Sequence, residues 1–300
     1  MIIFMREKNI PPEINFKKDG VQYCWLGTAG VYICDGKNGF VIDPYVSRHG
    51  MARVFLGLPL KPELCLIKQW ADVLGNPGYD AVLVSHSHFD HLLDAPFFAL
   101  ERGVPLTGSS STAMAGRGYG LDRALIDEVR PGDSRAYGDF TVTFIESAHG
   151  PAFAGRIPYP GAIGAPLVPP RPATAYRLGT TFSFLVEHPL GTAVHHGSAG
   201  FIKGMYDGIR ADKIFLGIAG RGGNTAEYIE NVVIPLQART VIPVHFDNFF
   251  RPLNAPMKYV PGLHLKEFLE TASRYNSFDI VFPPFVSSSS FEAQTLFSGN

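Results

Sequence analysis

Short apolar runs alternate with turn signals along most of the chain, and this pattern predicts a mixed α/β protein. β-Branched and aromatic residues dominate the runs, and Gly, Asp, Asn or Pro follow most of them, which is typical of strands that end in turns. The predicted strands are the segments 21–26, 31–34, 40–42, 81–84, 104–107, 140–145, 181–186, 192–194, 213–219, 240–246 and 280–282. Helical spacing or helix-forming composition predicts helices in 62–70, 92–103, 226–233 and 263–275.

Three segments outside this pattern are expected to lack regular structure. Residues 116–120, Gly-Arg-Gly-Tyr-Gly, lack the Lys-Ser/Thr ending of a phosphate-binding loop, so we expect a flexible connection. Residues 151–178 are rich in Pro, Gly and Ala, and we expect a long loop draped over a cleft. The tail from Ser287 onward is expected to fray.

The densest set of candidate metal ligands is the segment 85–91, Ser-His-Ser-His-Phe-Asp-His, which follows an apolar run and leads into a predicted helix. Neutral imidazoles and carboxylates suit zinc, iron or manganese. His86 and His88 are two positions apart at the end of an extended segment, so their rings point to the same side. Asp90 and His91 fall past the bend and can face a second ion. A helix cap would need only one short polar side chain.

The segment 85–91 resembles the His-x-His-x-Asp-His signature of the metallo-β-lactamase-fold hydrolases. The flanking residues 25–30 and 40–45 resemble the branch that contains the ascorbate-6-phosphate lactonases and the N-acyl-phosphatidylethanolamine phospholipases. The resemblance covers roughly residues 20–250. It implies an α/β fold, a four-layer αββα sandwich, and we expect a single domain across residues 1–300.

The resemblance also implies six metal ligands in two groups. The first group is His86, His88 and His149, and the second is Asp90, His91 and His245. His149 and His245 each come at the end of a predicted strand, as ligand histidines do in the family. The expected cofactor is zinc, as one or two ions, with manganese or iron as alternatives.

At residues 195–200, His-His-Gly-Ser-Ala-Gly, the chain departs from the family pattern. Ser198 stands where the family has an aspartate that bridges two metal ions. Three outcomes stay open: one metal binds firmly and a second loosely, His195 or His196 substitutes, or a water or hydroxide bridges alone. Of the two histidines we favour His196 near the site. Asp247 is a further candidate replacement, although a loop role is preferred.

Residues near the ligands are candidates for supporting roles. Asp43 ends a predicted strand, and we expect it to be structural or to orient a ligand histidine, with direct metal binding as the alternative. The candidate substrate contacts are Tyr45, Arg48, Phe153 and Tyr159. The first two lie where the resemblance places one wall of the cleft, and the last two belong to the Pro-rich loop.

Composition narrows the class of protein. The formal net charge is -1 and no long basic run occurs, so nucleic-acid binding is not expected. The three cysteines are scattered and odd in number, which fits a reducing compartment. No apolar run approaches the ~20 residues that span a bilayer, and the start of the chain does not resemble a signal peptide. We therefore expect a soluble cytoplasmic protein; its oligomeric state is left open.

These residues predict a metal-dependent hydrolase that acts on a small molecule. A metal ion lowers the pKa of bound water to ~7, and the resulting hydroxide attacks a carbonyl carbon or a phosphorus. Asp90 is expected to orient the nucleophile and to carry a proton to the leaving group. The resemblance favours a lactone or a phosphate ester. The alternatives are a β-lactam or amide hydrolase and a non-catalytic metal-binding relative, for which Ser198 is the main support.

Overall fold

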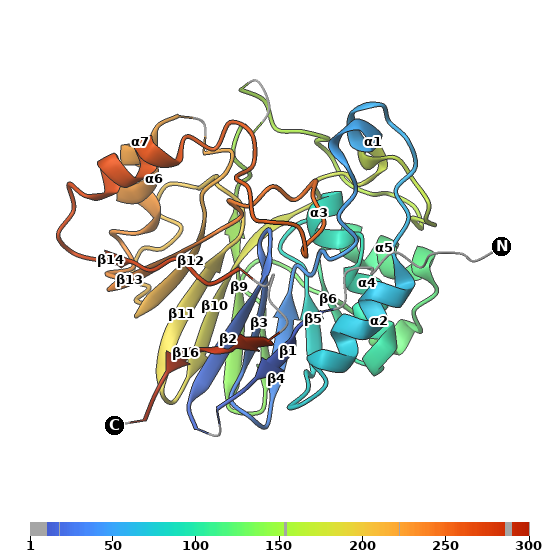
Figure 1. The fold of residues 1–300 in the computed structure, drawn as a ribbon, viewed down its shortest axis with the longest axis horizontal. Helices are drawn as coiled ribbons and strands as arrows, with labels where there is room; N and C mark the ends of the chain where they lie inside the picture. The colour runs from blue at the N-terminus through green and yellow to red at the C-terminus, as the bar shows by residue number, and fades with distance from the viewer. Residues whose placement is uncertain (1–10, 18, 153–154, 222, 286–289, 300) are drawn as a thin grey trace.

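The structure, a computed structural model, describes residues 11–17, 19–152, 155–221, 223–285 and 290–299. Within these residues two seven-stranded sheets pack face to face and helices cover the outer face of each sheet (Figure 1). This is the four-layer αββα sandwich that the resemblance to the metallo-β-lactamase-fold hydrolases implies, and the mixed α/β class that the apolar pattern predicts. The single domain across residues 1–300 stays a prediction.

The first sheet combines an antiparallel meander with a parallel half. Its strands are β2 (Val21–Gly27), β3 (Gly30–Cys34), β4 (Gly39–Ile42), β5 (Ala81–Leu83), β6 (Leu106–Gly108), β7 (Ile126–Glu128) and β16 (Gln294–Phe297). Their spatial order is β16-β2-β3-β4-β5-β6-β7. β2, β3 and β4 pair antiparallel, whereas β4 to β7 pair parallel.

The second sheet has the same arrangement as the first: β8 to β11 pair antiparallel and β11 to β14 pair parallel. Its strands are β8 (Ser134–Tyr137), β9 (Phe140–Ser147), β10 (Thr181–His188), β11 (Gly191–His196), β12 (Lys213–Gly217), β13 (Thr240–Val244) and β14 (Asp279–Ile280). Their spatial order is β14-β13-β12-β11-β10-β9-β8. A separate two-stranded ribbon pairs β1 (Glu13–Asn15) with β15 (Ser290–Glu292) in parallel.

Helices lie on both outer faces of the sandwich. α2 (Leu64–Val73), α4 (Ala95–Arg102) and α5 (Ser110–Tyr119) cover the first sheet, and α6 (Thr225–Val232) and α7 (Leu265–Ala272) cover the second (Figure 1). The short helices are α1 (Met51–Phe55), α3 (Phe89–Leu92), η1 (Arg123–Leu125) and η2 (Ala173–Ala175). Among the described residues no helix is both long and apolar enough to cross a membrane.

The strands β2, β3 and β4 are buried on both faces because the sheet lies between its helices and the other sheet, whereas β7, β8 and β9 keep exposed positions. In β2, Tyr23 and Trp25 belong to the core between the sheets, whereas Cys24 and Leu26 belong to the core under the helices. Successive side chains of a strand point to opposite faces. A two-sided core therefore explains why β2 is a nearly continuous apolar run rather than an alternating one.

Two of the predicted irregular segments are regular, and those predictions are wrong. Residues 116–119 form the last turn of α5, where Gly118 lets the backbone of Leu167 approach: an added Cβ would lie 2.2 Å from the Leu167 oxygen. The tail prediction is wrong for β16, which pairs with β2 at the edge of the first sheet and buries Leu296 and Phe297, whereas residues 287–289 lie outside the described residues.

The consecutive histidines at the end of β11 are both buried. Nε2 of His195 donates to the Ala29 oxygen at 2.8 Å. Nδ1 of His196 lies 2.7 Å from Oγ of Ser183 and 2.8 Å from the Tyr206 hydroxyl. Burial lowers the pKa of His196 to about 3. This ring is therefore neutral in the folded protein over a wide range of pH.

This burial predicts an acid-dependent loss of stability. Below pH ~6.5 the unfolded chain protonates residue 196, whereas the folded chain takes that proton only near pH 3, so stability falls as the pH falls through this window. Between pH 7 and pH 5 the effect is about 2 kcal/mol. We expect His196→Gln to lose less stability than wild type over this interval, as measured by urea unfolding of the metal-free protein. The exposed His264, changed to Gln, is the control, and equal losses in wild type and His196→Gln would contradict this account.

Candidate metal centre

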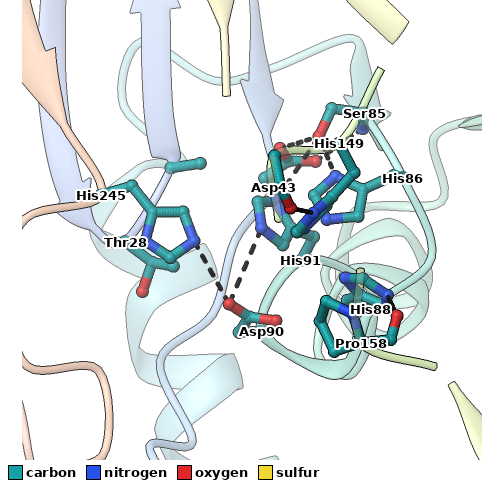
Figure 2. A network of polar contacts seen from close by, with 12 residues as sticks. Thr28, Asp43, Ser85, His86, His88, Asp90, His91, His149, Pro158 and His245 are labelled. Carbon is teal, nitrogen blue, oxygen red and sulfur yellow. Dashed lines mark hydrogen bonds and ion pairs between the residues drawn. The ribbon is translucent and has the colours of Figure 1, made fainter. Parts of the chain in front are cut away.

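Three imidazoles from two strand ends form the first cluster. His86 and His88 follow β5, and His149 follows β9. The ring centroids of His88 and His149 are 4.7 Å apart, and each lies 4.9 Å from that of His86. One ligand nitrogen from each ring lies within 4.8 Å of the others. The spacing is that of groups that can share one cation (Figure 2).

Hydrogen bonds to carbonyl oxygens fix which nitrogen two of these rings present. A carbonyl only accepts, so Nε2 of His88 donates to the Pro158 oxygen at 2.9 Å, and Nδ1 of His149 donates to the Gly150 oxygen at 2.7 Å. His88 thus offers Nδ1 and His149 offers Nε2. Nε2 of His86 is buried and has no hydrogen-bond partner among the described residues. A buried nitrogen that keeps its lone pair and has no hydrogen-bond partner suits a metal ligand.

The second cluster is built from Asp90, His91 and His245. Oδ2 of Asp90 lies 3.3 Å from Nε2 of His245 and 3.7 Å from Nε2 of His91. One ligand atom from each residue lies within 4.8 Å of the others. The rings of His86 and His91 are 3.8 Å apart, so the two clusters adjoin. Figure 2 shows Asp90 between His91 and His245, with dashed lines to both.

The protonation states suit metal binding. Burial, with help from neighbouring imidazoles, lowers the pKa of His88 to about 3 and that of His149 to about 4. The same causes hold the pKa of His86 well below its usual value. Burial alone would raise the pKa of Asp90, but His91 and His245 hold it below the ordinary range. The first cluster therefore offers lone pairs of neutral rings, and the second contains an ionised carboxylate.

Asp43 orients His91 rather than joining either cluster. Oδ2 of Asp43 accepts from Nδ1 of His91 at 2.8 Å, and Oδ1 accepts from the Ser85 amide at 2.7 Å. Nε2 of His91 is thereby left to face Asp90. A carboxylate behind a ligand histidine fixes the tautomer and strengthens the ring as a donor to metal. This is the orienting role that the sequence suggests for Asp43.

A buried ion pair holds the loop that carries His245. The amide of His245 donates to the Thr28 oxygen at 2.6 Å, and the Thr28 amide donates to Oδ1 of Asp247 at 2.7 Å. Oδ2 of Asp247 pairs with Nη1 of Arg48 at 2.6 Å, and these side chains are 2% and 1% exposed. Gly27, with φ +79°, is required here because an added Cβ would lie 2.0 Å from Nη2 of Arg48. Thr28, Arg48 and His245 themselves have positive φ, so the surrounding contacts impose this geometry.

A cavity of about 760 Å³ opens over both clusters. It is lined by all six candidate ligands, by Ser198 and by Tyr159 of the Pro-rich loop. The Tyr159 ring lies 6.1 Å from the ring of His88. The loop therefore reaches the site twice, through the Pro158 carbonyl and the Tyr159 side chain, as its predicted position over a cleft requires.

The structure does not bring every candidate to this cavity. Tyr45 is fully buried, where its hydroxyl accepts from the His49 amide, and Arg48 is occupied by Asp247, so neither lines the cavity. His196 belongs to neither cluster. Phe153 lies outside the described residues.

Ser198 lies at the cavity, but its hydroxyl donates to the Ala148 oxygen at 2.8 Å. Asp247, which the sequence offers as a replacement for the bridging aspartate, is held by Arg48 and the Thr28 amide instead. Asp90 is thus the only carboxylate among the described residues of the two clusters. A centre with two cations would keep a large excess of positive charge.

Some residues that line the cavity were not predicted from the sequence. Phe249 and Phe250 line the cavity, and the signal that could have found them is their place directly after the ligand His245. The role of the Pro158 carbonyl could not be predicted in this way, because every residue has a backbone oxygen and no residue type marks the one that accepts from a histidine. Arg221 also lines the cavity, although its guanidinium is taken up by Glu267 at 2.7 Å and by three backbone oxygens.

A third group of possible ligands lies at the other end of the strands. Asp35, Asp139 and His188 meet at the turn after β3, the turn before β9 and the end of β10. The Leu190 amide donates to Nδ1 of His188 at 3.2 Å, so Nε2 carries the hydrogen and faces Asp35 at 3.6 Å. A nitrogen that carries a hydrogen does not bind a metal ion. We therefore interpret this group as a contact that holds neighbouring turns together.

Comparisons with known proteins agree with this geometry. The sequence pattern of the Metallo-beta-lactamase superfamily matches residues 26–243, and the chain belongs to that superfamily. A UPF0173 metal-dependent hydrolase of Anaeromyxobacter sp. (strain K) is 26% identical over 238 residues, covering 76% of this chain and 75% of that protein. A second, from Mesorhizobium japonicum, is 25% identical over 255 residues, covering 81% of this chain and 92% of that protein. The lactonase and phospholipase branch stays a prediction.

Solved structures show the same fold. A possible metal-dependent hydrolase from Veillonella parvula matches with a TM-score of 0.57 at 16% identity, covering 92% of this chain and 99% of that one. Igni18, a metallo hydrolase from Ignicoccus hospitalis, matches with a TM-score of 0.54 at 15% identity, covering 88% and 95%. At these identities the likeness concerns the fold alone.

The buried ion pair predicts that Arg48 acts on stability. Arg48→Met leaves the Asp247 carboxylate buried and unpaired, which we expect to lower the free energy of unfolding by about 3 kcal/mol. Arg48→Met/Asp247→Asn should regain part of that loss. Chemical denaturation measures both, with the exposed Arg53→Met as control. A normal stability for Arg48→Met, together with a raised KM, would instead make Arg48 a substrate contact.

Proposed function

We propose that this protein is a metal-dependent hydrolase that cleaves a lactone or a phosphate ester. The observation that carries the proposal is the convergence of six ligand side chains on the floor of one cavity, with neutral imidazoles in the first cluster and an ionised carboxylate in the second. Imidazole and carboxylate donors suit zinc, as one or two ions, and manganese or iron are alternatives. The names of the curated relatives as metal-dependent hydrolases support the assignment. The cytoplasmic location stays a prediction.

The chemistry follows from the donor set. A divalent cation bound there supplies Lewis acidity, because it lowers the pKa of water to about 7 and stabilises negative charge that develops on oxygen. His88 and His149 would hold it through the nitrogens left free by their hydrogen bonds to the Pro158 and Gly150 oxygens. Asp90 lines the cavity and is ionised, so it accepts a proton from the attacking water and returns it to the leaving group.

Ser198 bears on the substrate class. Its neutral hydroxyl leaves Asp90 as the one carboxylate of the described clusters, so a loaded centre carries more positive charge than a centre with a bridging aspartate. Excess positive charge favours an anionic substrate, which supports a phosphate ester over a neutral lactone. Because the carboxylate of a bridging aspartate is missing, we expect a second cation to bind more weakly than the first.

Metal content is the direct test of the clusters. We expect between one and two equivalents of metal per wild-type chain and almost none in His86→Ala/His88→Ala, because that double variant removes two of three donors from the first cluster. Elemental analysis after dialysis measures this. His264→Ala, which removes a cavity histidine outside both clusters, should keep the wild-type content. Retention of full metal content by the double variant would sink the proposal.

Substitution of Asp90 tests the proposed catalysis. Asp90→Asn keeps the shape of the side chain but cannot accept a proton, so in protein whose metal content matches that of wild type we expect kcat to fall by about 100-fold or more while KM changes little. The assay is a panel of chromogenic lactones, phosphodiesters, phosphotriesters and a β-lactam, with and without chelator. Turnover of no member would favour the non-catalytic alternative, and equal activity of Asp90→Asn would remove Asp90 from the mechanism.

A further inference from the structure

The cavity has one chemically distinct wall. Beside the metal clusters, Met51, Val54 and Phe55 from α1 and Phe249 and Phe250 from the segment after β13 line one side. Every side chain in this group is apolar, and three are phenyl rings. Pockets that bind small molecules place a few polar groups at the reacting end and apolar walls around the remainder.

The aromatic rings of this wall form a continuous line. The ring of Phe249 meets the ligand His245 edge to face with centroids 5.2 Å apart, and the next ring, Phe250, lies 4.4 Å from Phe249. Phe55 follows at 6.2 Å from Phe250. The line begins at the second metal cluster and ends at the surface, where Phe55 is 56% exposed. We call these three phenylalanines the aromatic track.

Apart from histidines, the charged side chains among the described lining residues are Asp90, Arg221 and Glu267. Asp90 belongs to the second cluster, and Arg221 and Glu267 come from the segments at α6 and α7 and pair with each other at 2.7 Å. Arg221 is 8% exposed and also donates to the backbone oxygens of Ile218 and Leu263. Of the three, Asp90 lies at the inner end of the aromatic track beside His245, whereas Arg221 and Glu267 are occupied by each other.

The segment that carries Phe55 exposes further apolar side chains. In the eight residues from Met51 to Leu58, four large apolar side chains are exposed: Met51, Phe55, Leu56 and Leu58. Leu56 is 73% exposed. Figure 1 shows α1 at the upper end of the molecule, on the opposite side from α6 and α7. Met51 and Phe55 both line the cavity and are exposed, so apolar ligand surface that reaches them is removed from water.

We propose that the substrate is an amphiphile whose hydrolysable head lies at the metal clusters and whose alkyl chain lies along the aromatic track. This inference rests on the proposed function for the position of the head, and on the track alone for the chain. The shared chemistry is an unbranched apolar chain attached to a phosphate ester or lactone. Each buried methylene should tighten binding roughly two- to fourfold until the chain passes Phe55.

The test is the binding of straight-chain alkyl phosphonates, from ethyl to dodecyl, to the metal-loaded protein. Phosphonates offer the anionic head but no bond to hydrolyse, so calorimetry reports Kd without turnover. We expect Kd to fall roughly two- to fourfold per methylene and then level off, at concentrations below micelle formation. The titration with decyl phosphonate is done twice, with the free compound and with the compound in phosphatidylcholine vesicles. A lower Kd with the vesicles identifies a bilayer as the source of substrate.

Two variants of exposed apolar residues make the experiment specific. Phe55→Ser should reduce the ratio of the ethyl to the dodecyl Kd at least tenfold, because it interrupts the outer end of the track. Leu190→Ser, at the β10–β11 turn and outside the cavity, should keep the wild-type ratio. Equal Kd values for ethyl and dodecyl phosphonate, or an unchanged ratio in Phe55→Ser, would overturn this inference while the proposed function stands. Chain-length-dependent binding without hydrolysis of any panel substrate would overturn the proposed function instead.

Discussion

The candidate site depends on hydrogen bonds that decide which nitrogen of each imidazole faces inward. Carbonyl oxygens of Pro158 and Gly150 hold the outer nitrogens of His88 and His149, and the Asp43 carboxylate holds that of His91. A neutral imidazole has one lone pair, so a bond at the wrong nitrogen would leave nothing for a cation. The backbone around the clusters is therefore as much a part of the site as the histidines are.

This requirement explains why the sandwich and the site are inseparable. The ligands follow β5, β9 and β13, and the residues that orient them follow β2 and β4 or belong to the Pro-rich loop. Both sheets pack into buried cores, which makes their ends rigid. Residues with positive φ, including Asp43 and His245, are tolerated there because packing and hydrogen bonds on every side hold them.

The polar clusters and the aromatic track give the cavity two functions that reinforce each other. The clusters can activate water, while the track and α1 can remove the remainder of a substrate from water. Asp90 lies at the junction, since it lines the cavity within 3.3 Å of His245, the residue from which the track begins. Under the proposed function, Ser198 favours an anionic head because it supplies no carboxylate.

The sequence by itself predicted the α/β class and most strands, because short apolar runs that end in turn residues are local signals. The αββα sandwich and the six candidate ligands came from the resemblance to the metallo-β-lactamase-fold hydrolases, and their role as ligands stays a prediction, although the structure brings the six side chains together in two clusters. The prediction from local sequence was wrong for residues 116–119 and for β16 in the tail. There, contacts with distant segments, Gly118 against Leu167 and β16 against β2, outweigh local composition.

Only the tertiary structure decided which polar neighbours face the cavity. Arg48 and Tyr159 look alike in sequence as polar residues near the site, yet one is locked to Asp247, 199 positions away, and the other lines the cavity. The positions of the Pro158 carbonyl and of the aromatic track beside the metal clusters likewise depend on the tertiary structure. Their roles arise from distances between segments far apart in the chain, and no local pattern encodes such a distance.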